Sequence, residues 1–191
     1  MDDIATAAGV TKPLLYQHFA SKRALYLELV DSVARDMLVA IDNATSSAQG
    51  PRQQVEAGFA AYFHVVVTHQ DAFRLLFGSD VPDDPDLSRA LRRVEDTVAE
   101  AVDVLIDAGL DSEHRRLLAY AVVGMATGAS RHWLGSNPRD REPTKRASGS
   151  GEVPDTAGPP LTGSPGQLEA DRLARRVSDL AWAGLRSVHS D

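Results

Sequence analysis

The chain has 191 residues, of which 43% are hydrophobic and 25% are charged, and it contains no cysteine. This is the composition of an ordinary globular protein, and the lack of thiols excludes a disulfide framework, a thiol nucleophile and a cysteine-based zinc site. The formal charge of −7 argues against a surface that coats nucleic acid as a whole, so any contact with DNA must come from a local patch.

No apolar run approaches the roughly 18 to 20 residues that span a bilayer, and the start of the chain, MDDIATAAG, lacks the basic and apolar regions of a signal peptide. We therefore expect a cytoplasmic protein without membrane contact. Apolar residues recur at helical spacing almost everywhere, and no convincing run alternates with the period of a strand. The sequence predicts an all-α fold.

The first elements expected along the chain are two short helices joined by a glycine turn. The first covers residues 2–8, Gly9 supplies the turn, and the second covers about 11–19 with Thr11 as its N-cap. Pro13 is tolerated because N–H groups in the first turn of a helix have no intrahelical partner. Two short helices around such a turn form a helix-turn-helix.

The second short helix has an apolar side and a polar side. Leu15 and Phe19, with Val10 and Ile4, are expected to form the small core between the two helices. A helix of about nine residues is roughly 13 Å long and matches a major groove about 12 Å wide. The side chains left to contact bases or phosphates are Lys12, Pro13, Tyr16, Gln17 and His18, with Lys22 at the start of the next helix.

Further amphipathic helices follow. Ser21 caps a long helix that ends near Asn43, and helices are then expected after Gly50-Pro51, around 73–77, over 87–105 and from a cap at Asp111 or Ser112 to about residue 134. The last of these contains LLAYAVVGMATGAS, which is apolar nearly all round and is expected to be buried on several sides. A final helix carries an apolar face over 173–185.

The composition changes between residues 137 and 166, where six of the ten prolines lie beside glycine and serine. This segment predicts a loop or a disordered insert, because it has too few large apolar residues to offset the cost of ordering. We divide the chain into a helix-turn-helix region with its connecting helix, residues 1–42, and a C-terminal helical domain, residues 43–191.

The central aromatic residues have two interpretations, plain core or the lining of an effector pocket. The pocket hypothesis predicts a largely hydrophobic effector of unknown identity with a polar group near His64, and its candidate lining is Phe59, Tyr62, Phe63, His64, Phe73, Phe77, Met125 and Trp133. Gly124 and Gly128, near Ala121, allow helices to approach closely, either at a dimer seam or within one chain. No group of Asp, Glu and His has metal-ligand spacing, so no metal or other cofactor is expected.

The stretch MDDIATAAGVTKPLLYQHFASKRALYLELV resembles the TetR family of bacterial transcriptional regulators. The resemblance rests on the order of an Ile4-Ala5 pair, a turn glycine followed by Val10, a mid-helix tyrosine, a terminal phenylalanine and Ser21-Lys22. FRLLFGSD and LAWAGLR also look like a subgroup of the family's regulatory domains. The residues that it implies to face DNA are Thr11, Lys12, Pro13, Leu14, Tyr16, Gln17, His18 and Lys22.

The resemblance also implies a homodimer formed through the last two helices and bound to double-stranded DNA at a pseudo-palindromic operator. The candidate interface residues are Ala121, Gly124, Gly128, Val177, Leu180, Trp182 and Leu185. Family members begin with another helix of about 20 residues, and the sequence given starts inside the motif. Three explanations stay open for this missing helix: the start is assigned too far downstream, the segment was left out, or the protein truly lacks it.

Enzyme function is not expected, because neither GxSxG nor HExxH occurs and no carboxylate pair can be assigned to a cleft by spacing. We expect a repressor that leaves its operator when an effector tilts the long helix after Ser21. The alternative is a helical dimeric ligand-binding or interaction protein without specific DNA binding, if the first family helix is truly absent.

Overall fold

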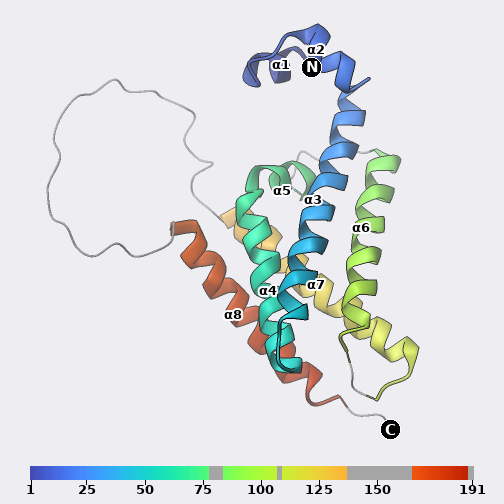
Figure 1. Ribbon diagram of the computed structural model, residues 1–191, viewed down its shortest axis with the longest axis vertical. Helices are drawn as coiled ribbons and strands as arrows, with labels where there is room; N and C mark the ends of the chain where they lie inside the picture. Colours follow the sequence, from blue (N-terminus) through green and yellow to red (C-terminus); the bar gives the residue numbers. More distant parts are fainter. Residues whose placement is uncertain (78–83, 107–108, 137–164, 189–191) are drawn as a thin grey trace, which may run out of the picture.

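The computed structural model describes residues 1–77, 84–106, 109–136 and 165–188, and most of the expected insert at 137–166 lies outside these residues. Every regular element in the described ranges is a helix, which confirms the all-α prediction (Figure 1). The helices are α1 (Asp2–Ala7), α2 (Lys12–His18), α3 (Lys22–Ser46), α4 (Pro51–Thr68), α5 (Gln70–Phe77), α6 (Pro85–Asp103), α7 (Ser112–Ser136) and α8 (Pro165–Leu185).

Local signals account for where several helices begin. The Ser21 hydroxyl accepts a hydrogen bond from the Ala24 N–H at 3.1 Å and so caps α3, and the Asp111 carboxylate accepts two N–H bonds in the first turn of α7. Gly9 has φ +65°, the left-handed conformation that the turn between α1 and α2 requires. Thr11 occupies the N-cap position of α2, but its side chain makes no cap hydrogen bond.

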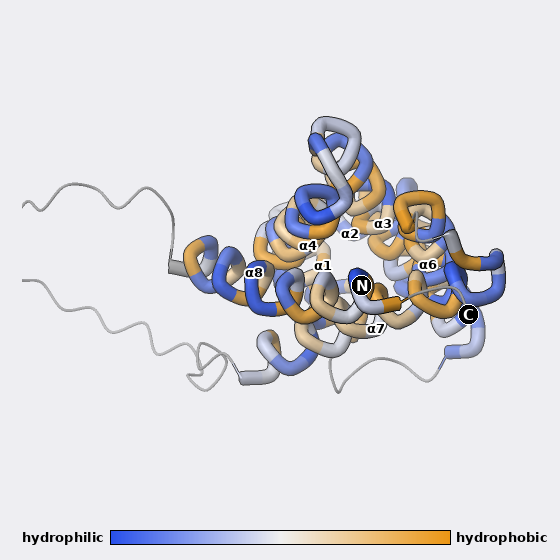
Figure 2. Tube along the Cα trace, turned by 90° about the horizontal axis from the view of Figure 1, so that it is seen from below, coloured by the Kyte–Doolittle hydropathy of each residue, from blue (hydrophilic) through white to orange (hydrophobic). Residues whose placement is uncertain are grey.

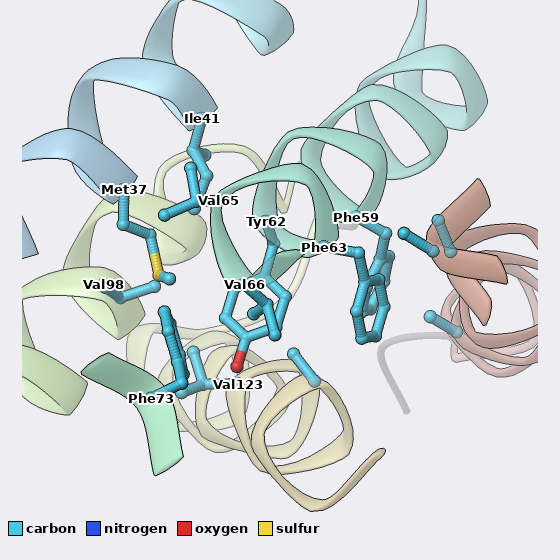
Figure 3. Packing of buried hydrophobic residues seen from close by; sticks show 14 of the residues in the cluster. Met37, Ile41, Phe59, Tyr62, Phe63, Val65, Val66, Phe73, Val98 and Val123 are labelled. Atoms are coloured by element: carbon cyan, nitrogen blue, oxygen red, sulfur yellow. The ribbon is translucent and has the colours of Figure 1, made fainter. Parts of the chain in front are cut away.

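Helix α4 lies at the centre of the bundle. It packs most extensively against α8 and α3, and α6 pairs with α7. Phe63 and Val66 of α4 are only 1% and 0% exposed, and Figure 3 shows them within the apolar core. Figure 2 shows hydrophobic and hydrophilic residues alternating around the helices, as amphipathic packing requires. None of the described helices is both long enough and apolar enough to cross a membrane.

Helix α7 differs in part from the expectation of burial on several sides. Leu117 is 65% exposed, and Ala121, Gly124 and Gly128 continue the same exposed stripe along the helix. The other side of α7 packs against α6, α8, α4 and α5, which leaves this stripe uncovered within one chain. The helix is thus buried on the sides that face four other helices, as predicted, and departs from the prediction only in this exposed stripe.

The helix-turn-helix is built around a very small core. Ala5 and Leu15 are buried, and Ile4 and Phe19 are half-buried. Val10 was expected in this core but is 36% exposed, because the turn bonds its N–H to the Ala5 carbonyl and leaves the side chain on the outside. Among the described residues, α1 and α2 make close backbone contacts with each other and with no other helix.

The predicted boundaries and the described ones differ by a few residues. Helix α3 continues to Ser46 rather than ending near Asn43, so it runs unbroken across the proposed domain boundary at 42/43. Helix α8 begins at Pro165, inside the predicted insert. The expectation that a preceding family helix is missing stays a prediction.

Candidate functional site

Helix α2 presents the predicted DNA-facing residues on its exposed side. Leu15 is the buried residue of this helix and holds it against α1. The helix has seven residues, which makes it about 10 Å long at 1.5 Å per residue, short enough to enter a major groove about 12 Å wide. All eight predicted residues are exposed: Thr11, Lys12, Pro13, Leu14, Tyr16, Gln17, His18 and Lys22.

Lys12 is paired with an acidic residue of α1. Its Nζ lies 2.8 Å from Oδ1 of Asp2, and the two side chains are 54% and 69% exposed. The hydrogen bond from Lys12 lowers the pKa of Asp2, and the same bond raises the pKa of Lys12. A phosphate or base that binds Lys12 must therefore compete with this carboxylate.

The two cations at the start of α3 have different neighbours. Lys22 lies over the ring of Tyr26, with its Nζ 5.8 Å from the ring centroid, and stays exposed. Arg23 Nε lies 3.1 Å from Oδ2 of Asp84, and the Arg23 guanidinium also pairs with Asp86. Asp84 is the N-cap of α6, so Arg23 fastens the beginning of α3 to the beginning of α6.

A cavity of about 310 Å³ lies toward the other end of α3. Thr45 of α3 lines it and lies about 35 Å along the helix from Lys22. Helices α4, α6, α7 and α8 complete a mostly apolar wall, to which Gln54 and Arg186 add polar groups. The aliphatic lining includes Ile41, Val55, Val98, Val102, Leu105, Ile106, Val122, Val123, Leu185 and Val188.

The predicted pocket residues divide between this cavity and its surroundings. Phe59 and Tyr62 line it, and a second cavity of about 50 Å³ is lined by Tyr62 with Phe73 and Phe77. The others lie elsewhere: Phe63 and Trp133 are buried in the core, Met125 is half-buried against it, and His64 is exposed. Sequence reasoning missed the aliphatic residues of α6, whose spacing is the same for a core face and for a cavity wall.

The predicted interface residues also divide into two groups. Ala121, Gly124, Gly128 and Leu180 are exposed on α7 and α8. A side chain built at either glycine would meet open space. Val177 packs against the core, whereas Trp182 and Leu185 line the main cavity.

A helix-turn-helix mounted on one long helix, with a helical bundle around the far end of that helix, defines a class of DNA-binding transcriptional regulators. Residues 1–29 match the family described as bacterial regulatory proteins of the tetR family. The chain is also 31% identical over 145 residues to the HTH-type transcriptional activator FasR of Mycolicibacterium smegmatis. The chain belongs to the TetR family of transcriptional regulators.

The extent of these similarities differs. The match to FasR covers 74% of this chain and 66% of FasR, and a match to the regulator EthR of the same organism, 31% identical over 70 residues, covers 36% of this chain and 32% of EthR. The fatty acid degradation regulator FadR from Bacillus halodurans has the same fold, with a TM-score of 0.69 at 16% identity over 97% of this chain and 84% of FadR. A TetR/AcrR-family regulator from Thermobifida fusca gives 0.55 at 19% identity, over 99% of this chain and 86% of that one.

Proposed function

We propose that the chain is a cytoplasmic repressor that binds a pseudo-palindromic operator as a homodimer and leaves it when a largely hydrophobic effector binds. The observation that carries the proposal is the pairing of an exposed helix α2 at one end of α3 with an apolar cavity near the other end. Two α2 helices in a two-fold dimer would enter successive major grooves about 34 Å apart.

Contacts with DNA are assigned by chemistry. Gln17 pairs with adenine and so reads sequence, and Lys12 does the same where it reaches a guanine edge rather than a phosphate. Tyr16 and His18 donate to phosphates, and Lys22 adds charge next to the backbone. The exposure of all five side chains supports these roles.

The exposed stripe on α7, together with Leu180 on α8, supports the homodimer. Leu117 and Leu180 are 65% and 64% exposed, and Gly124 and Gly128 let a partner helix approach closely. Leu180→Glu is expected to give a monomer in sedimentation equilibrium. Leu75→Glu is the matched control, because Leu75 is 51% exposed on α5, away from this stripe, and its replacement should leave a dimer.

The cavity supports an effector with an acyl chain and an acidic group. Its wall is mostly apolar, and Arg186 at the end of α8 supplies a cation. His64, the side chain first expected near the polar group, does not line the cavity. FadR from Bacillus halodurans, which shares the fold, is a regulator of fatty acid degradation. We assign the carboxylate of a fatty acid to Arg186 and the chain to the apolar wall.

Release from DNA is a shift between two populations. A fatty acid that fits the cavity better in the state incompatible with DNA favours that state, tilts α3 and changes the distance between the two α2 helices. A ligand with equal affinity for both states changes nothing, however tightly it binds.

The test begins with selection from a randomised duplex pool at two salt concentrations, followed by titration of the selected DNA with and without fatty acid. A palindromic site, affinity that falls with salt and release by the fatty acid are the expected results. Tighter binding with fatty acid would refute repression by release. The selection of no DNA would favour a dimeric ligand-binding protein without specific DNA binding.

A further inference from the structure

The main cavity and the smaller one are separated by a single layer of side chains. Tyr62, Val98 and Val123 line both. The smaller cavity extends from this layer to Val33, Ala34 and Met37 in the middle of α3, and its far side is formed by residues of α5. It therefore lies nearer to the helix-turn-helix along α3 than the main cavity, which meets α3 at Ile41 and Thr45.

Tyr62 is the residue of this layer that can move. Valine side chains are stiff at χ1, whereas the tyrosine ring turns about two torsions. Burial raises the pKa of Tyr62, so its hydroxyl stays neutral. The hydroxyl lies 3.3 Å from Ser130 Oγ, whose single proton is shared with the closer Ala126 carbonyl at 2.9 Å, so this hydrogen bond is long; Thr127 is a second side-chain partner of the Tyr62 hydroxyl.

Two aromatic rings pack against Tyr62, and one of them also lines the smaller cavity. Tyr62 meets Phe63 and Phe73 edge to face, with centroids 5.2 and 6.5 Å apart, and Figure 3 shows it between α3 and α7. Phe73 itself lines the smaller cavity. A chain that advances past Tyr62 turns the ring against these neighbours and enters a space bounded by α3 and α5.

We propose that Tyr62 is a gate that measures the length of the effector's acyl chain. Short chains fill the main cavity and leave the gate closed, whereas longer chains displace Tyr62, enter the smaller cavity and press on the middle of α3. This inference rests on the proposed function, because it assigns the length selectivity of the same effector site.

Calorimetric titration of the whole chain with octanoate, decanoate, laurate, palmitate and stearate tests the gate. In the unaltered protein, affinity should rise about fourfold per buried methylene. The increase in affinity with chain length should stop at the length at which the acyl chain reaches Tyr62, and it should resume for longer acids that enter the smaller cavity. Tyr62→Ala should remove this break and tighten binding of the longest acids at least tenfold relative to octanoate. Tyr62→Phe keeps the ring and should keep the break.

Two further variants separate the gate from general effects on the cavity. Ala34→Leu fills the smaller cavity from α3, so it should weaken only the longest acids, about tenfold or more. Val102→Ala is the matched control, because Val102 lines the main cavity alone and its replacement should change all lengths by one common factor. Octanoate binding in each variant verifies that the site is folded.

The outcomes distinguish the gate from the proposed function. Binding of fatty acids with one uniform dependence on length, unchanged by Tyr62→Ala and Ala34→Leu, would overturn the gate and leave the hydrophobic effector in place. If no acid of any length binds, both the gate and the acyl effector are refuted. The gate is established if the length dependence shows the break, Tyr62→Ala removes it, and Ala34→Leu weakens only the longest acids.

Discussion

Replacing Asp2 with asparagine is expected to tighten DNA binding more than the same replacement at Asp3. Both residues are exposed acids in the first turn of α1, so both changes remove one negative charge next to the DNA phosphates. Only Asp2 pairs with Lys12, at 2.8 Å. Asp2→Asn therefore removes repulsion and also frees the lysine that we place in the DNA interface.

The size of the difference follows from the exposure of the pair. An ion pair as exposed as this one contributes a factor of about 1.4 to 5 to an equilibrium constant. Asp2→Asn should therefore bind DNA more tightly than Asp3→Asn by about that factor for each recognition helix, and by about its square in a dimer that uses both helices.

Fluorescence anisotropy with the selected duplex at several salt concentrations measures this difference. Lys12→Ala should weaken binding and reduce the slope of log K against log salt by about 0.9 for each helix. In the Lys12→Ala background, Asp2→Asn and Asp3→Asn should become equivalent. Equal effects of the two asparagine variants in the unaltered background would refute the competition between Asp2 and DNA for Lys12. An unchanged salt slope together with an unchanged affinity in Lys12→Ala would remove Lys12 from the interface.

Four other changes have defined outcomes. Tyr16→Phe should weaken operator binding by about 1 kcal/mol through the loss of one phosphate hydrogen bond, and unchanged anisotropy titrations would contradict that contact. Ser21→Ala should lower the free energy of unfolding by about 1 kcal/mol in urea, whereas Thr11→Ala, whose side chain makes no cap bond, should change it little; equal effects would refute the cap assignment. Phe63→Ala should cost about 3 to 5 kcal/mol by the same measurement, because the ring is fully buried, and a loss below 1 kcal/mol would mean that the core closes around the gap. Arg23→Gln removes the ion pair between the start of α3 and the start of α6, so fatty acid should lower DNA affinity less in this variant than in the unaltered protein. An equal loss of affinity in both proteins would exclude a role of this ion pair in the response.

The DNA-binding end could be predicted from the sequence because its signals are local. Gly9 marks the turn, Pro13 fits the first helical turn, and the Ser21 side chain caps the next helix three residues before Ala24. Each of these constraints acts within a few residues. The exposure of the Val10 side chain could not be predicted in the same way, because it depends on how α1 and α2 pack against each other.

The cavity could not be located from the sequence because a helical stripe shows which side faces inward and not how completely that side is packed. Val98 and Val102 repeat at the same spacing as any core face, yet they line the cavity. Phe63 and Trp133 suggested a pocket by their size, but both are packed in the hydrophobic core and line neither cavity. Trp182 faces the cavity because α8 packs along α4, a contact between segments far apart in the chain.

Two helices connect the cavity to the DNA-binding end. Both α3 and α6 line the main cavity, and Arg23 ties the start of α3 to Asp84 at the start of α6. Because α1 and α2 make no close backbone contact with any other described helix, a displacement at the cavity reaches them through the start of α3. The Arg23–Asp84 pair is partly exposed and adds little to stability, but together with the buried cluster of Val30, Leu87 and Ala90 it marks the point about which we expect α3 to turn against α6. An effector that moves α3 away from α6 at the cavity therefore rotates α3 about this point, and α2, which comes directly before it, changes its angle to the DNA.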